Sequence, residues 1–86
     1  MTGRFEEAVS AYKKAVQRAP NDIWVHLNLA ATYSMMGREN EARAEAAEVL
    51  RINPKFSLDS FAKIIPFKDQ TIIDNFIKAL RKAGLK

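Results

Sequence analysis

The feature that most constrains this chain is a segment that occurs twice. Residues 3–22 read GRFEEAVSAYKKAVQRAPND, and residues 37–56 read GRENEARAEAAEVLRINPKF. The two segments stand in one register, 34 residues apart, and the matching positions are Gly3 and Gly37, Ala8 and Ala42, and Pro20 and Pro54. A fixed period of this length indicates a repeat architecture, in which each unit buries its apolar face against a neighbouring unit.

The spacing of apolar residues predicts helices throughout the chain. Residues 5–19 and 39–52 each place their apolar side chains on one arc of a helix with 3.6 residues per turn. Residues 23–36 differ, because ten of these fourteen residues are apolar and surround most of the helix. A helix of this kind is buried between neighbours or faces a binding groove. A short helix is expected at 57–65, and a fifth helix follows Asp69.

Boundary residues mark where these helices begin and end. The expected N-caps, whose side chains accept a backbone N–H, are Asp22, Ser57 and Asp69. The expected C-terminal signals are Gly37 and Gly84, with left-handed backbone, and Pro66, which ends the fourth helix. Leu85 is then predicted to fold back onto Leu80 in a Schellman closure.

A known repeat pattern can be laid over residues 23–56. The tetratricopeptide pattern is W-x2-L-G-x2-Y, then A-x3-F, then P, with a period of 34 residues. The residues in these slots, in order, are His26, Leu29, Ala30, Tyr33, Ala42, Ala46 and Pro54. The chain therefore resembles a tetratricopeptide repeat protein over residues 3–56. His26 in the Trp slot and Ala46 in the Phe slot depart from the pattern.

The resemblance implies an all-α fold, a fragment of a helix-turn-helix solenoid with about one and a half repeats. We expect a single domain over residues 1–86, in which residues 3–22 form a half repeat, 23–56 a full repeat and 57–86 a capping helix pair. A cap of this kind covers the apolar end of a solenoid. The last segment also looks like the closing part of tetratricopeptide regions in bacterial multi-domain signalling proteins, some of which carry a nucleotide cyclase domain. We find no cyclase catalytic residues in this chain.

Few residues are suited to catalysis or to metal binding. The chain has no cysteine, and His26 is its only histidine, so no second imidazole or thiolate exists to share a metal with it. We interpret His26 as a packing residue in the Trp slot. The carboxylates expected on the solvated faces of helices are Glu6, Glu7, Glu39, Glu41, Glu45 and Glu48. The sequence thus predicts no enzyme, no catalytic residue, no metal, no cofactor and no small-molecule substrate.

The charge pattern does not favour nucleic acid as a partner. The net charge is +4, and a basic cluster near the end comprises Lys78, Arg81, Lys82 and Lys86. Cations in the last turns of a helix complement its dipole, and no aromatic residue lies among these four to stack on bases. We also find no leader and no apolar run of membrane-spanning length, so we expect a soluble, cytoplasmic chain without a membrane partner.

The resemblance also implies a place for a ligand. In tetratricopeptide proteins the first helix of each unit lines a concave surface, a role that falls here to residues 23–36 and 57–65. The residues expected to line this groove are Trp24, Leu27, Asn28, Ala31, Met35, Leu58, Phe61 and Ile65. The family's clamp for acidic chaperone C-termini needs Lys and Asn at the positions of Leu27 and Ala31, so the clamp is not expected. The floor is instead apolar.

Two interpretations of this apolar set remain open. Either it forms a groove that binds a peptide or helix of a partner protein, or it is covered by the fifth helix and belongs to the core. The predicted function is accordingly a protein–protein interaction module, and the alternative is an oligomerisation or scaffold element of a larger protein. For that alternative, the helix expected at 5–19 presents Ala8, Tyr12 and Ala15 for self-association, and we expect a homodimer.

Overall fold

The computed structural model describes residues 3–65 and 68–86, and the expected helix stop at Pro66 lies outside them. The described residues form five helices and no strand, as the sequence predicted. The helices are α1 (Gly3–Arg18), α2 (Ile23–Met35), α3 (Glu39–Ile52), α4 (Leu58–Ile64) and α5 (Gln70–Lys82).

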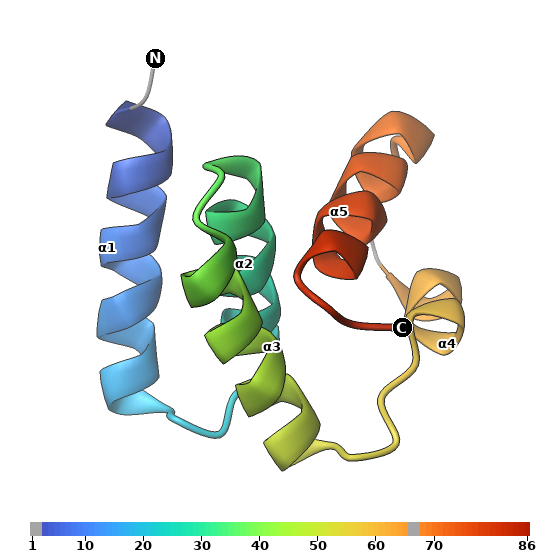
Figure 1. The fold of residues 1–86 in the computed structure, drawn as a ribbon, viewed down its shortest axis with the longest axis horizontal. Helices are drawn as coiled ribbons and strands as arrows, with labels where there is room; N and C mark the ends of the chain where they lie inside the picture. Colours follow the sequence, from blue (N-terminus) through green and yellow to red (C-terminus); the bar gives the residue numbers. More distant parts are fainter. Residues whose placement is uncertain (1–2, 66–67) are drawn as a thin grey trace.

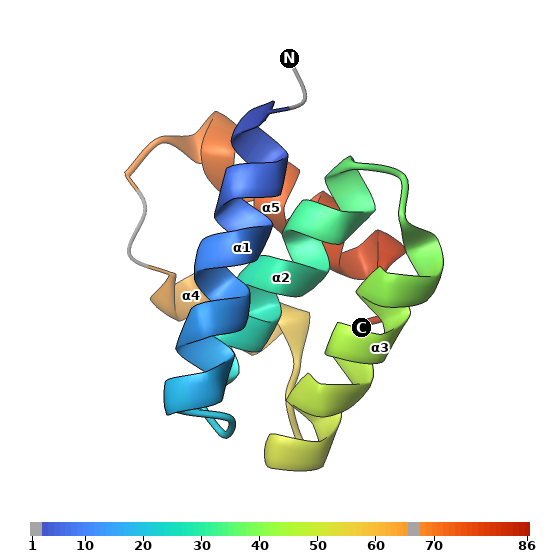
Figure 2. The same ribbon diagram turned by 90° about the vertical axis from the view of Figure 1, so that its left-hand side faces the viewer.

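Helix α2 is the centre of the structure. Helices α1, α2 and α3 run alternately up and down, and α4 and α5 lie on the side of α2 opposite α1 (Figure 1). After a turn of 90°, α3 is seen to run back down alongside α2 from the loop that joins them (Figure 2). α2 packs against α1, α3 and α5, and its contacts with α3 are the most extensive. The helix that is apolar around most of its circumference is therefore the one that other helices surround.

The expected N-caps begin their helices as predicted, and the two expected glycines end theirs. The Asp22 and Asp69 side chains accept from the Trp24 and Thr71 N–H groups at 3.0 and 2.8 Å, and Ser57 accepts from Ser60. Gly37 and Gly84 have φ values of 81° and 108°, a region that strains side chains with a Cβ.

Both glycines close Schellman motifs. The Arg38 N–H donates to the Tyr33 carbonyl at 2.9 Å, and the Leu85 N–H donates to the Leu80 carbonyl at 3.2 Å. Since Leu80 and Leu85 are fully buried, the predicted closure at the end of α5 is confirmed.

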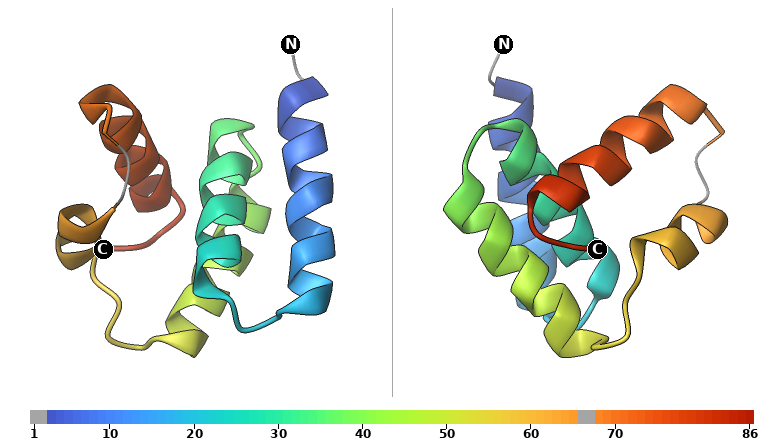
Figure 3. Two further views of the ribbon diagram at one scale, coloured as in Figure 1. Left: turned by 180° about the vertical axis from the view of Figure 1, so that it is seen from behind. Right: turned by 45° about the vertical axis from the view of Figure 1, so that its right-hand side comes forward.

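The C-terminal residues return across the molecule to the start of α4. The chain after α5 runs back beside α2, as the two further views show (Figure 3). The Leu58 N–H donates to the Lys86 carbonyl at 2.9 Å, which joins the two ends of the capping helix pair. The α4–α5 pair is thus held to α2 by α5 and by the residues after it.

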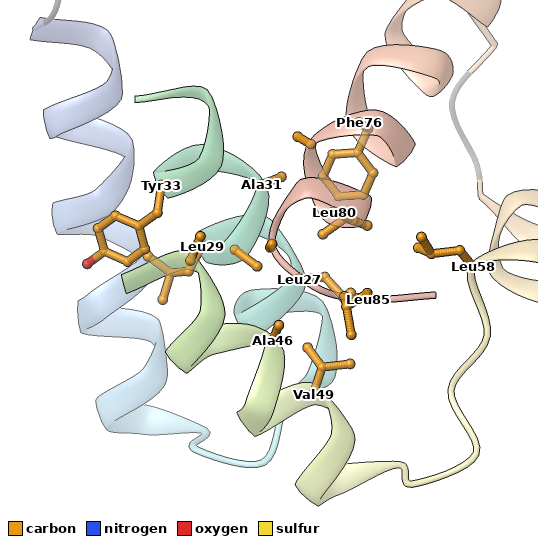
Figure 4. Packing of buried hydrophobic residues seen from close by; sticks show 14 of the residues in the cluster. Leu27, Leu29, Ala31, Tyr33, Ala46, Val49, Leu58, Phe76, Leu80 and Leu85 are labelled. Atoms are coloured by element: carbon orange, nitrogen blue, oxygen red, sulfur yellow. The ribbon is translucent and has the colours of Figure 1, made fainter. Parts of the chain in front are cut away.

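The core has two parts, one on each side of α2. Leu29 and Tyr33 point toward α1 and α3, whereas Leu27 and Ala31 point toward α5 (Figure 4). Ala42 and Ala46 on α3 are buried, and their small side chains permit a close approach of α3 to α2. None of the described helices is long and apolar enough to cross a membrane.

Candidate functional site

The expected groove is largely filled by the chain itself. Its floor residues, all buried in the structure, are Leu27, Ala31, Leu58, Phe61 and Ile65. Leu80 and Leu85 lie against Leu27, while Phe76 lies near Ala31 (Figure 4). The expectation of an open groove along α2 is therefore wrong for these five residues, because α5 and the residues after it occupy the concave side. The alternative, in which α5 covers them, describes the structure.

The other three expected groove residues remain accessible. Trp24 and Met35 on α2 are 37% and 49% exposed, and Asn28 between them is half-buried. The Asn28 amide donates to the Trp24 carbonyl at 2.9 Å, which uses part of its hydrogen-bonding capacity within the helix. The expected groove residues on α2 that remain accessible thus lie near the first and last turns of this helix.

The end near Trp24 borders a small apolar hollow. The hollow, which we call the aromatic hollow, has a volume of about 130 Å³ and is lined by Ile23, Trp24, Leu27, Asn53, Phe56, Phe61 and Ile64. The ring of Phe61 is the centre of its wall, because the centroids of Trp24 and Phe56 lie 5.3 and 5.6 Å from it in tilted arrangements. Such aromatic contacts add about 0.5–1.5 kcal/mol beyond area burial. The wall is therefore preformed.

Sequence reasoning named three residues of the aromatic hollow and missed four. Ile64 is 73% exposed and lies on α4 beside the apolar face that Leu58, Phe61 and Ile65 share. The sequence did contain a signal for Ile64, because an isoleucine that the apolar face of a helix does not need is a candidate for an exposed binding surface. Phe56 entered the sequence analysis only as the last residue of the repeat at 23–56, and its place beside Phe61 depends on the tertiary fold.

The end near Met35 borders a second hollow, of about 260 Å³. Ser34 and Met35 of α2 line it together with Asn75, Lys78, Ala79 and Lys82 of α5. Lys78, Arg81 and Lys82 are exposed, and the last two lie in the final turn of α5, where they complement the helix dipole. Their position agrees with the expectation that the basic cluster complements the dipole of the last helix.

The expected self-association residues lie on α1. Ala8, Tyr12 and Ala15 are half-buried, and Tyr12 packs against the core formed with α2. Ala15 also lines a shallow hollow of about 430 Å³ together with Ala11, Lys14, Arg18, Ala19, Asp22 and Val25. The accessible part of this face therefore centres on Ala11 and Ala15, and Tyr12 lies mainly beneath it.

His26 is buried, as expected for a residue in the Trp slot, but it is not a simple packing residue. Its Nδ1 lies 2.7 Å from Glu45 Oε1, and its Nε2 lies 2.7 Å from the Pro20 carbonyl oxygen. The assignment of Glu45 to a solvated face was thus wrong, since its side chain is 21% exposed and bonded to a buried ring. Within residues 3–65 and 68–86, no three His, Cys, Asp or Glu side chains gather to hold a metal ion.

Comparison with known proteins decides the family. A family model described as tetratricopeptide repeat matches residues 1–59, which is more than half of the chain. The chain belongs to the tetratricopeptide repeat family. The match ends near the start of α4, so the model does not extend over α5.

The curated relatives are longer tetratricopeptide proteins. The chain is 33% identical over 54 residues to Hsp70-Hsp90 organizing protein 3 of Arabidopsis thaliana, a match that covers 63% of the chain and 10% of that protein. It is 39% identical over 44 residues to putative adenylate cyclase 3 of Rhizobium meliloti, covering 51% and 8%. The chain thus corresponds to at most a tenth of the length of these relatives. No solved structure gives a significant match.

Membership in this family places the chain among interaction modules. Tetratricopeptide domains are generally non-catalytic and bind proteins or peptides. The coarse functional prediction, a protein–protein interaction module, is therefore confirmed. Which surface a partner uses has to be inferred from the accessible features of α2 and α4.

The burial of the groove floor leads to the first prediction. Leu27→Glu should unfold the domain, because a buried unpaired carboxylate costs about 3 kcal/mol or more in a small domain of marginal stability. Met35→Glu should change the free energy of unfolding by less than about 0.5 kcal/mol, because that side chain is half exposed. Circular dichroism during urea unfolding measures both. A folded Leu27→Glu variant would show that the groove floor is open to solvent.

Proposed function

We propose that the chain binds a partner protein by taking a bulky apolar side chain of a peptide or helix into the aromatic hollow. The observation that carries this proposal is the accessible apolar rim of the hollow, formed by Trp24 on α2 and Ile64 on α4. This site retains Trp24, Leu27 and Phe61 of the expected groove and moves the binding surface from the middle of α2 to its first turns. In the same proposal, residues 57–86 are the capping helix pair of a single domain.

The dimensions of the aromatic hollow favour a side chain over a whole small molecule. Its volume of about 130 Å³ lies below the roughly 300–1,000 Å³ of typical small-molecule sites. Its lining supplies one polar side chain, Asn53, which suits an apolar anchor with a single hydrogen-bonding neighbour. We accordingly assign the chain no catalytic function, cofactor or small-molecule substrate.

The energetics of such binding depend on the rim. Apolar surface removed from water contributes roughly 25 cal/mol per Å², and Trp24 and Ile64 are among the large apolar side chains that the fold leaves exposed. Tryptophan is enriched among residues that dominate binding energies, particularly where neighbouring groups exclude water. The Phe61 ring already packs against the Trp24 ring and is itself backed by Phe56, so little order has to be gained on binding.

The chain offers a direct probe for this proposal, because Trp24 is its only tryptophan. Short peptides with one Leu, Ile or Phe anchor should shift Trp24 fluorescence on titration, and the same peptides with Ala at the anchor should not. Ile64→Glu should weaken binding more than about tenfold, since it places a charge on the apolar rim. Ile72→Glu is the matched control, because Ile72 is 52% exposed and does not line the hollow.

Two outcomes would contradict the proposal. One is that no anchored peptide binds better than its alanine counterpart. The other is that Ile64→Glu and Ile72→Glu weaken binding equally, which would place the peptide elsewhere on the surface.

We propose self-association through α1 as a second function, with another copy of this chain as the occupant of the shallow hollow. Charge complementarity between Glu7 in the first half of α1 and Lys14 in the second supports it. If two copies pair about a two-fold axis with α1 antiparallel to α1, Glu7 of each copy faces Lys14 of the other. Ala11 lies near the axis in this arrangement.

Sedimentation equilibrium at tens of micromolar tests the homodimer. A mass near twice 9.7 kDa is expected, and Ala11→Glu should return it to the monomer value, because the exposed Ala11 side chain lines the hollow. Ser10→Glu introduces the same charge at the adjacent exposed position, which does not line the hollow, and should leave the dimer intact. A monomeric mass for the unmodified chain would refute this proposal.

A further inference from the structure

The buried ring of His26 has an oxygen acceptor at both of its nitrogens. The Pro20 carbonyl is able only to accept a hydrogen bond, and so is an ionised Glu45 carboxylate. A neutral imidazole carries one N–H and therefore satisfies one of the two contacts, which are both 2.7 Å long. The geometry requires one more proton than neutral His26 and ionised Glu45 supply. An imidazolium ring, which donates from both of its nitrogens, supplies this proton.

The groups around His26 favour the charged ring. Glu45 and Glu48 on α3 both attract it. The Arg51 guanidinium donates to Glu48 Oε1 and to Asn21 Oδ1, each at 3.0 Å. On the ring's own helix, the Asp22 carboxylate accepts from the Trp24 N–H. The charges that face His26 from α3 are thus mainly negative.

These contacts raise the pKa of His26 above its ordinary value of about 6.5. Burial by itself would lower the pKa, because it disfavours the charged ring. The hydrogen bond with Glu45, the bond with the Pro20 carbonyl and the attraction of Glu45 and Glu48 together outweigh burial. The ring therefore keeps its second proton to higher pH in the folded chain than in the unfolded one.

We propose that His26 is a proton-dependent lock that joins three segments of the fold. As an imidazolium it ties the turn between α1 and α2 to α2 itself and ties α2 to α3. Loss of a proton leaves one of its nitrogens facing an oxygen acceptor without an N–H, so one of the two ties is lost. Because α1 packs mainly on α2 and leads directly into this turn, the last turn of α1 is the part that loosens.

The sign of the pH dependence follows from the raised pKa. A group that binds its proton more tightly in the folded state stabilises the fold fully below the unfolded pKa and loses that contribution as pH rises through the folded pKa. The chain should therefore become less stable as the pH rises above the ordinary histidine pKa of about 6.5 and through the raised pKa of folded His26. The unfolding equilibrium constant should rise by about tenfold for each unit that separates the two pKa values.

The decisive experiment is a pH titration of the ¹⁵N-labelled imidazole by NMR. We expect both ring nitrogens to carry protons below the transition and the ring to titrate with a pKa above about 6.5. The protection of amides near the end of α1, measured relative to intrinsic exchange at each pH, should fall through the same transition. A pKa at or below the ordinary value, or a ring that carries one proton below the transition, would overturn the proposal.

Three variants separate the lock from other titrating groups. His26→Phe fills the Trp slot with an apolar ring and should remove the pH dependence of stability that the unmodified chain shows. Glu45→Gln should lower the pKa of His26, whereas the matched control Glu48→Gln should lower it less, because Glu48 acts on the ring only through space. Equal effects of the two glutamine variants, or an unchanged pH dependence in His26→Phe, would contradict the lock.

Discussion

The structure depends on the need to cover α2 on every side. Most of its residues are apolar, and eight of its thirteen residues are buried. A single neighbouring helix covers one arc of such a surface, so α2 requires α3, α1 and α5 together. The repeat arrangement supplies α1 and α3, and the C-terminal helix pair supplies α5. Folding of the chain is thus tied to the docking of its last helix.

The placement of α5 also explains where a binding surface remains. Phe76 and Leu80 cover the middle of α2, and the buried Leu85 continues this cover toward α4. Helix α4 has only seven residues, so beside the first turns of α2 it presents only Phe61 and Ile64 to the hollow. The aromatic hollow is the space between these short surfaces. A capping helix pair that fills most of a concave face leaves a small site at one end of it.

The features that could be predicted from the sequence are those that depend on residues close together in the chain. The period of 34 residues and the boundary residues Asp22, Gly37 and Gly84 act within a few residues of where they stand, so the helices and their ends followed from them. The cover over Leu27 and Ala31 depends on a helix far along the chain. Periodicity shows that a face is apolar, but it does not show which segment buries it.

The contact of His26 with Glu45 was unpredictable for a related reason. Glu45 lies on the same helix as several solvated carboxylates, and the spacing of charges on α3 does not distinguish it from them. Only the packing of α3 against α2 brings its side chain within hydrogen-bonding distance of a ring 19 residues earlier. In the same way, Phe56 and Ile64 join the aromatic hollow through the fold rather than through a motif.

Native-state hydrogen exchange tests the central claim, that α5 is part of the cover over α2, most directly. If the claim holds, the amides of α5 from Phe76 to Leu80 exchange through the same opening as the central amides of α2, with protection within about tenfold of theirs. The amides of α1 should exchange through a lower-energy opening, since α1 packs mainly on α2. Exchange of α5 at rates near those of an unfolded peptide, while α2 remains protected, would contradict the account.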